Sequence, residues 1–125
     1  MNKLLIALLA LAITGCTTVK TFNSAPQNYR LKGTEKTLNI TGDLKQTFKQ
    51  NPIVSTAESE LKIYFDGKLT ITGFLDSSYG GEFKGIPYDD KATAASCNTK
   101  RVAENTGETR CIVFVDNERT VTLQF

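Results

Sequence analysis

Two short runs of alternating apolar and polar residues, separated by Asp66-Gly67, constrain the fold more than any other part of the sequence. The runs cover residues 61–65 and 68–72. Alternation with a period of two is typical of a half-buried strand. Asp-Gly between two such runs favours a tight hairpin, because both turn positions need positive φ. The sequence therefore predicts an antiparallel pair of strands with one face in a core.

A second hairpin is predicted at the end of the chain. Residues 111–115 form the run richest in β-branched and aromatic side chains, which fit a pleated surface. Residues 116–119 are polar and turn-forming, and residues 120–125 alternate again. Further short strands are expected at residues 37–41 and 82–84. The fold class that follows is all-β, a small antiparallel β-sandwich or half-open barrel of six to eight strands.

One segment is consistent with a short helix. Asp43 precedes Leu44 and Phe48, which are four positions apart, and Pro52 would end a helix that began there. One or two helical turns over residues 43–49 and a polar loop fit this pattern about equally well.

The N-terminus has the composition of a secretory signal. Lys3 supplies one positive charge, and residues 4–13 are an unbroken run of Leu, Ile and Ala. Ten helical residues reach roughly 15 Å, about half of a bilayer core. Residues 13–16, Ile-Thr-Gly-Cys, resemble the lipobox of bacterial lipoproteins. The resemblance implies cleavage after Gly15 and acylation of Cys16, whereas an ordinary secretory signal with a chance cysteine is the alternative.

The lipoprotein resemblance also bears on location and domain organisation. Thr17 stands where lipoproteins retained in the inner membrane of enteric bacteria carry Asp, so sorting to the outer membrane is implied, with the domain in the periplasm or at the cell surface. The predicted parts are a signal peptide (1–15), a lipidated N-terminus and flexible linker (16–36), and one β-rich domain (37–125). Packing of Phe22, Tyr29 and Leu31 as an edge strand is the alternative for the linker.

Two cysteines remain once Cys16 is assigned to lipid. Cys97 and Cys111 form an even pair in an oxidising compartment, which predicts a disulfide bond. A redox-active pair would favour a Cys-x-x-Cys spacing instead. The polar residues 98–109 between them are expected to form a surface loop with fixed ends.

Composition argues against catalysis and against nucleic-acid binding. The chain has no histidine, which removes the usual base for Ser and Cys nucleophiles and the commonest zinc ligand. Its 15 Lys and Arg and 13 Asp and Glu are spread along the chain, whereas phosphate binding needs a concentrated positive face. No cofactor or metal is expected. Carboxylates near turns keep a small carboxylate-based enzyme and a calcium site as weaker alternatives: Asp76, Glu82, Asp89, Asp90, Asp116 and Glu118.

The function expected is that of a non-catalytic binding or accessory protein of the cell envelope, whose partner is an envelope or external protein. Inhibition of an external hydrolase such as lysozyme is the main alternative. A rigid loop with aromatic anchors is the candidate contact, because interfaces favour Tyr and Phe. The residues proposed for it are Tyr79, Gly80, Gly81, Glu82 and Tyr88.

Overall fold

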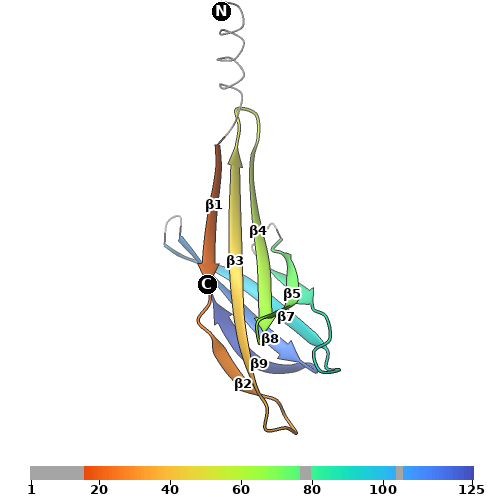
Figure 1. Ribbon diagram of the computed structural model, residues 1–125. Coiled ribbons are helices and arrows are strands. Elements are labelled where there is room, and N and C mark those ends of the chain that lie inside the picture. Colours follow the sequence, from red (N-terminus) through yellow and green to blue (C-terminus); the bar gives the residue numbers. More distant parts are fainter. Residues whose placement is uncertain (1–15, 77–79, 104–105) are drawn as a thin grey trace, which may run out of the picture.

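The computed structural model describes residues 16–76, 80–103 and 106–125, which form two antiparallel sheets (Figure 1). Nine strands and no helix occur in these three segments, so the predicted all-β class is confirmed, with more strands than the six to eight expected. The sheets are not closed into a barrel. The strands are β1 (Cys16–Asn23), β2 (Gln27–Arg30), β3 (Thr37–Gln50), β4 (Ser55–Phe65), β5 (Lys68–Phe74), β6 (Gly81–Lys84), β7 (Thr93–Ala103), β8 (Thr106–Val115) and β9 (Glu118–Gln124).

The first sheet begins earlier in the chain than the sequence predicted. Its order is β1-β3-β4-β5, and β2 pairs with β3 on the same side as β1. Residues 16–36 are therefore not a flexible linker: they form two edge strands, and Leu31 after them is only 1% exposed. Thr and Val are frequent in β1, and side chains branched at Cβ favour strands. The residues of β1 are mostly polar because this edge strand is exposed on both faces.

The helix considered for residues 43–49 is also absent, since this segment is the second half of β3. Leu44 lies opposite Leu61 of β4, and Asp43 lies opposite Lys62. Two residues four positions apart share a face in a strand as well as in a helix. The spacing of Leu44 and Phe48 was therefore ambiguous, and pairing with neighbouring strands on both sides decided the outcome.

Both predicted hairpins are confirmed. Asp66 and Gly67 join β4 to β5 with φ of 51° and 80°, and Asp116 and Asn117 join β8 to β9 with φ of 51° and 62°. Positive φ at both central positions is the requirement of the tight turn that favours the strand twist. Strand β6 is also present where a short strand was expected.

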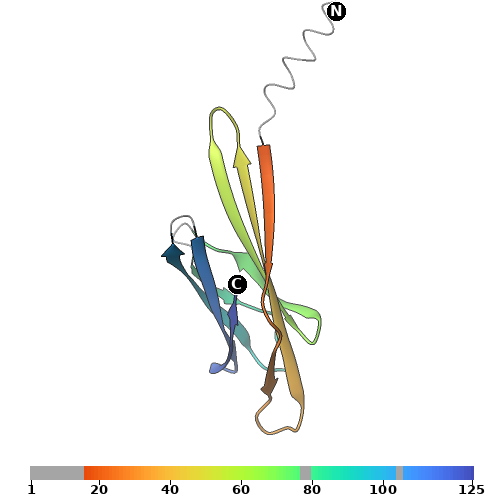
Figure 2. The ribbon, with the colours of Figure 1, turned by 90° about the vertical axis from the view of Figure 1, so that its left-hand side faces the viewer.

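The core lies between the inner faces of the two sheets, which Figure 2 shows packed against each other. Every second residue is buried in residues 38–44 of β3, 59–65 of β4 and 109–115 of β8, as expected for a sheet with one face in a core. Phe65 has the largest side chain among the fully buried residues. The other fully buried apolar side chains are Leu31, Leu38, Ile40, Leu44, Leu61, Ile63, Ile71, Val113, Cys111 and Leu123.

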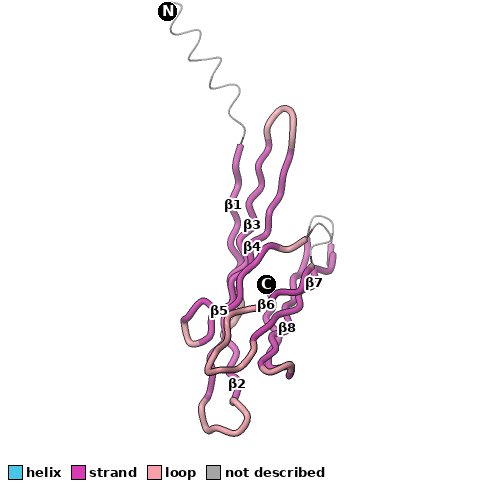
Figure 3. The backbone as a smooth tube through the Cα atoms, turned by 90° about the vertical axis from the view of Figure 1, so that its right-hand side faces the viewer, coloured by secondary structure: helices cyan, strands magenta, loops and turns pink. Residues whose placement is uncertain are grey.

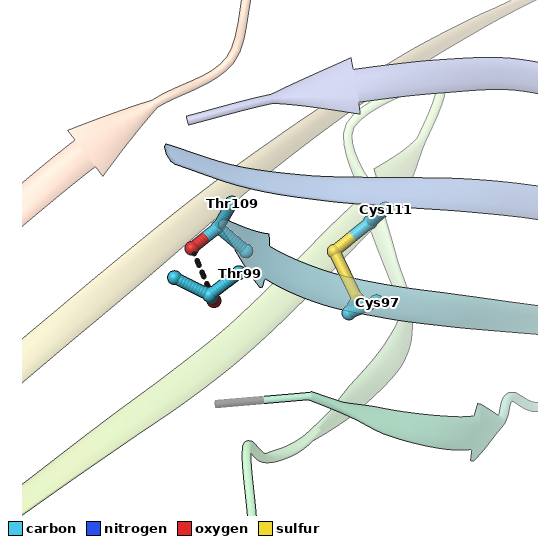
Figure 4. The surroundings of a disulfide bond; sticks show 4 residues. All are labelled: Cys97, Thr99, Thr109 and Cys111. Atoms are coloured by element: carbon cyan, nitrogen blue, oxygen red, sulfur yellow. Dashed lines mark hydrogen bonds between the residues drawn. A yellow bond between two sulfur atoms is a disulfide. The ribbon is translucent and has the colours of Figure 1, made fainter. Parts of the chain in front are cut away.

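The predicted disulfide bond joins β7 to β8 within the second sheet (Figure 4). Cys97 and Cys111 are directly opposite, with Cα atoms 4.1 Å apart. Residues 98–109 are not an open loop, because the two strands continue beyond the disulfide to Ala103 and Thr106. Thr99 and Thr109 are the next inward pair, and their hydroxyl oxygens lie 2.8 Å apart. These strand extensions were not predicted because their residues are mostly polar and lack apolar alternation.

Removal of the disulfide is expected to lower the free energy of unfolding by about 3 kcal/mol, the cost of a freed loop of roughly 15 residues. The variant Cys97→Ala with Cys111→Ala should melt roughly 10–20 °C below the oxidised protein. Thermal unfolding followed by circular dichroism measures the difference, with the reduced protein as control. Equal midpoints for the oxidised protein and the double variant would contradict a stabilising role.

Gly85 is required where the chain leaves β6 and passes close to β5 of the first sheet. A Cβ at this position would lie 2.6 Å from both the Thr70 carbonyl oxygen and Ile71 Cγ1, closer than atoms can approach. Gly85→Ala is therefore expected to cost about 1–3 kcal/mol through overpacking. Gly107→Ala is the matched control, because its Cβ would approach a side-chain methyl group of Thr99 at 3.1 Å and the Lys100 carbonyl oxygen at an ordinary 3.9 Å. It should change stability by less than about 0.5 kcal/mol. Urea unfolding distinguishes them, and equal losses would contradict the packing argument.

Candidate functional site

One end of the first sheet extends beyond the sandwich as a three-stranded arm, formed by β1 and the adjoining parts of β3 and β4 (Figures 1 and 3). The arm comprises residues 16–23 and 45–60. Every residue of β1 is exposed, and so are residues 48–50 of β3 and 55–58 of β4. Since no second sheet covers this part, the arm is held together by backbone pairing across three strands.

The two faces of the arm differ in chemistry. Phe22 lies opposite Leu44, so the inner face continues the core, and it ends at the half-exposed Phe48 opposite Ala57. The outer face is charged: Lys45 lies opposite Glu60. Opposite charges in cross-strand positions stabilise a sheet slightly. The arm therefore has a charged outer face that contacts water and an inner face that includes exposed apolar side chains.

Cys16 occupies the free end of the arm. It is exposed, its thiol is not in a disulfide, and it lies opposite Gln50. Its side chain borders a shallow hollow of about 300 Å³ on the inner face, lined also by Thr18, Lys20, Phe48 and Gln50. The sequence-predicted lipidation residue is thus at an accessible extremity with an aromatic side chain nearby.

The turn between β3 and β4 lies beside Cys16. Asn51 closes it, since its amide donates to the Val54 carbonyl at 3.2 Å and its side-chain oxygen accepts from the Ile53 amide at 3.0 Å. Ile53 is 91% exposed and Val54 is 51% exposed. Sequence reasoning treated this turn only as the place where Pro52 would end a helix.

The predicted contact loop is only partly assembled. Tyr79 lies outside the described residues. Gly80 continues into β6, where Gly81 is opposite Cys97 and Glu82 is opposite Ser96. Asp76 and Gly80 are joined by two hydrogen bonds: the Gly80 amide donates to the Asp76 side chain at 3.1 Å, and the Asp76 amide donates to the Gly80 carbonyl at 2.8 Å.

Tyr88 does not join this loop. It lies beyond the other end of β6, where its ring packs edge-on against Phe65 with centroids 5.4 Å apart. Its hydroxyl donates to Asp66 Oδ2 at 2.9 Å, and Lys36 Nζ lies 5.3 Å from the ring centroid. The Tyr88 side chain therefore fastens the β4–β5 turn and lies apart from Gly80, Gly81 and Glu82.

Glu82 instead borders a groove on the outer face of the second sheet. The groove is about 540 Å³ and runs over β7, whose small side chains Ala94 and Ser96 form its floor. Phe114 of β8 lies on one side and Glu82 and Lys84 of β6 on the other. A further hollow of about 290 Å³ next to Lys84 and Phe114 lengthens the groove; its other lining residues include Gly85, Pro87 and Ala92.

The groove is lined by small, aromatic and charged side chains. Its floor of Ala94 and Ser96 combines an apolar and a small polar side chain, and its charged groups are one carboxylate and one ammonium. In residues 16–76, 80–103 and 106–125, no three His, Cys, Asp or Glu side chains converge as a metal site requires. Sequence reasoning found Glu82 alone. The run of small residues in β7 is the sequence signal for the groove. It forms a groove only because larger side chains of β6 and β8 lie on each side of it.

One surface ion pair links the turn after β2 to β9. Lys32 Nζ lies 2.9 Å from Glu118 Oε1 and 2.9 Å from Oε2. The hydrogen bond to Glu118 and the charge of that carboxylate raise the pKa of Lys32 above its usual 10.5. The pair therefore stabilises the fold below that pH and is lost as the pH rises through the pKa of the folded state. Because both groups are exposed, its contribution is small.

Comparison with known proteins adds no relative: no family model, curated protein or solved structure matches the chain. The described segments also contain no helix long and apolar enough to cross a bilayer. The arm with Cys16 at its end and the groove over β7 are therefore interpreted from their own chemistry.

Proposed function

We propose that this chain is a lipid-anchored, non-catalytic binding protein of the bacterial envelope, held at the outer membrane through acylated Cys16. The observation that carries the proposal is the position of Cys16, exposed at the free end of the arm directly after the lipobox-like residues 13–15. An anchor attached at this residue leaves the sandwich unobstructed. The eight residues of β1 span roughly 25 Å, which separates the sandwich from the lipid surface.

The groove over β7 is the surface that we assign to partner binding. It lies on the outer face of the second sheet, whereas the arm belongs to the first sheet (Figure 2). Anchoring and binding therefore use different parts of the molecule. A floor of small side chains with Phe114 at its side and charged groups at its rim resembles the centre and rim of a protein–protein interface. The partner expected is a protein that places an apolar side chain or an extended segment over Ala94 and Ser96.

In-cell cross-linking of the full-length protein, followed by its capture from envelopes, tests the binding role. A single stoichiometric partner is expected. Ala94→Arg fills the floor of the groove and should lower the captured partner about tenfold or more. Thr72→Arg adds the same charge on the outer face of the first sheet and is the matched control, expected to leave capture unchanged.

Three outcomes separate the alternatives. Loss of the partner with Ala94→Arg alone supports the groove. A partner captured equally by both variants contradicts the groove as the binding surface. Absence of any partner from the producing cell contradicts an accessory role in its own envelope, and the next targets to test are then external proteins such as lysozyme.

A further inference from the structure

We infer that the β3–β4 turn, residues 51–54, inserts into the same lipid surface as the acyl chains on Cys16. The inference rests on the proposed lipid anchor and extends it. The protein would then touch the membrane at two neighbouring points, a covalent one and a side-chain one. Such a pair of contacts holds the arm upright, whereas a single lipid tether allows the sandwich to tilt freely.

The turn exposes apolar side chains at the extremity of the arm. Ile53 is 91% exposed and Val54 is 51% exposed, although the sandwich has a well-filled core elsewhere. A single exposed aliphatic residue is ordinary on a protein surface. Ile53 and Val54 are two consecutive exposed aliphatic residues at the end of a projecting sheet, and half-exposed Phe48 lies near them. Together they form an apolar patch whose exposure to water is unfavourable.

The backbone amide groups of the turn already have hydrogen-bond acceptors within the protein. Asn51 donates its amide to the Val54 carbonyl, Pro52 has no amide hydrogen, and the Asn51 side-chain oxygen accepts from Ile53 and Val54. Every backbone donor of the four residues is thus accounted for. Unpaired polar groups are what make the immersion of a loop in lipid costly. Insertion of this turn therefore leaves no backbone amide group without a hydrogen-bond acceptor.

The charges near the turn are arranged for a membrane surface. Residues 50–57 carry no charged side chain. Lys49 comes just before them and lies opposite Thr17, the residue after Cys16. A lysine at this height reaches the headgroup region while its methylene chain stays near the apolar layer. Cationic residues beside a lipid anchor favour anionic lipids.

The geometry brings the turn and the anchor together. Gln50 lies opposite Cys16 on one side and opposite Ser55 on the other, so these three residues form a row across the end of the arm. Residues 51–54 project beyond that row, and Figure 1 shows the turn at the same end of the molecule as the start of β1. Acyl chains that leave Cys16 for a bilayer therefore place the turn at the bilayer surface.

A fluorescent label at position 53 of the lipidated full-length protein tests the inference. With Cys16 acylated and Cys97 bonded to Cys111, Ile53→Cys supplies the single free thiol. The protein is reconstituted into phosphatidylethanolamine–phosphatidylglycerol vesicles, and quenching by brominated lipids is measured. We expect strong quenching and a blue shift at position 53. The matched control is Glu35→Cys, an exposed residue after β2 at the opposite end of the molecule, where neither is expected.

A second variant tests the apolar contact itself. Val54→Asp in the labelled protein places a charge in the inserted layer and should reduce the membrane-inserted fraction of the label roughly tenfold. Thr72→Asp, on the outer face of β5 and outside the arm, adds the same charge and should have little effect.

The outcomes distinguish this inference from the proposed anchor. An intact mass that shows lipid on Cys16 together with an unquenched label at position 53 overturns the inference and leaves the anchor standing. A mass without lipid on Cys16 overturns both. A blue shift that needs added envelope protein, and does not occur with vesicles alone, shows that the turn binds a protein and also overturns the inference.

Discussion

Cys16→Ala is expected to release the full-length protein from the membrane into the soluble envelope fraction. Each methylene of an acyl chain buried in lipid contributes about 0.8 kcal/mol, and two chains are enough for stable anchoring. Loss of all chains therefore lowers membrane partitioning by several orders of magnitude, far more than the loss of any side-chain contact. Fractionation of envelopes, followed by immunoblotting, measures the distribution.

The chain provides a matched control for this variant. Replacing Cys97 and Cys111 by Ala also removes thiol chemistry, but it leaves Cys16 and the residues before it intact. The double variant should stay in the membrane fraction although it is less stable. Retention of Cys16→Ala in the membrane to the same extent would contradict the lipid anchor.

Phe65→Ala is expected to lower the free energy of unfolding by about 3–5 kcal/mol, the cost of a large cavity in a core. Phe65 is fully buried at the end of β4, and the partly buried Tyr88 packs against its ring. The loss is a large share of the roughly 5–15 kcal/mol that holds a typical domain together. The variant should therefore be partly unfolded at physiological temperature.

Urea unfolding followed by circular dichroism measures this loss. Tyr88→Phe is the control, because it keeps the ring contact and removes only the hydroxyl that donates to Asp66. Its expected cost is about 0.5–1.5 kcal/mol, typical of one hydrogen bond. A cost below about 1 kcal/mol for Phe65→Ala would contradict the central place of this residue in the core.

The elements that sequence predicted best are those with local and complementary signals. The β4–β5 hairpin combines a period of two with Asp66-Gly67, and the structure shows positive φ at both turn residues. The disulfide followed from cysteine number and compartment alone, and its two residues prove to be direct partners in the second sheet. The hairpin prediction needed only residues close in sequence, and the disulfide prediction needed only the small number of cysteines.

The strands that sequence missed have no buried face over much of their length. β1 is exposed throughout, and its residues therefore carry no apolar alternation. Residues 43–50, 98–103 and 106–109 are strands because their neighbours offer backbone partners. Such pairing depends on long-range register, which the composition of one segment does not reveal.

The candidate site also combines a feature with a local sequence signal and a feature that depends on long-range strand pairing. Cys16 was found from a local motif, whereas the groove arises only when β6, β7 and β8 come into register and place large side chains on both sides of Ala94 and Ser96. Tyr88 was grouped with the contact loop, and its packing against Phe65 arises only from the folded chain. Glu82 was named for its loop and borders the groove instead.

The central claim is that Cys16 carries the lipid that holds this protein in the envelope. The most direct test is the intact mass of the full-length protein, extracted in detergent from the membranes of the producing bacterium and supported by fragmentation of its N-terminal peptide. The account predicts a chain that begins at Cys16, lacks residues 1–15 and carries diacylglycerol on the Cys16 sulfur. A mature chain with an unmodified Cys16 thiol would contradict it.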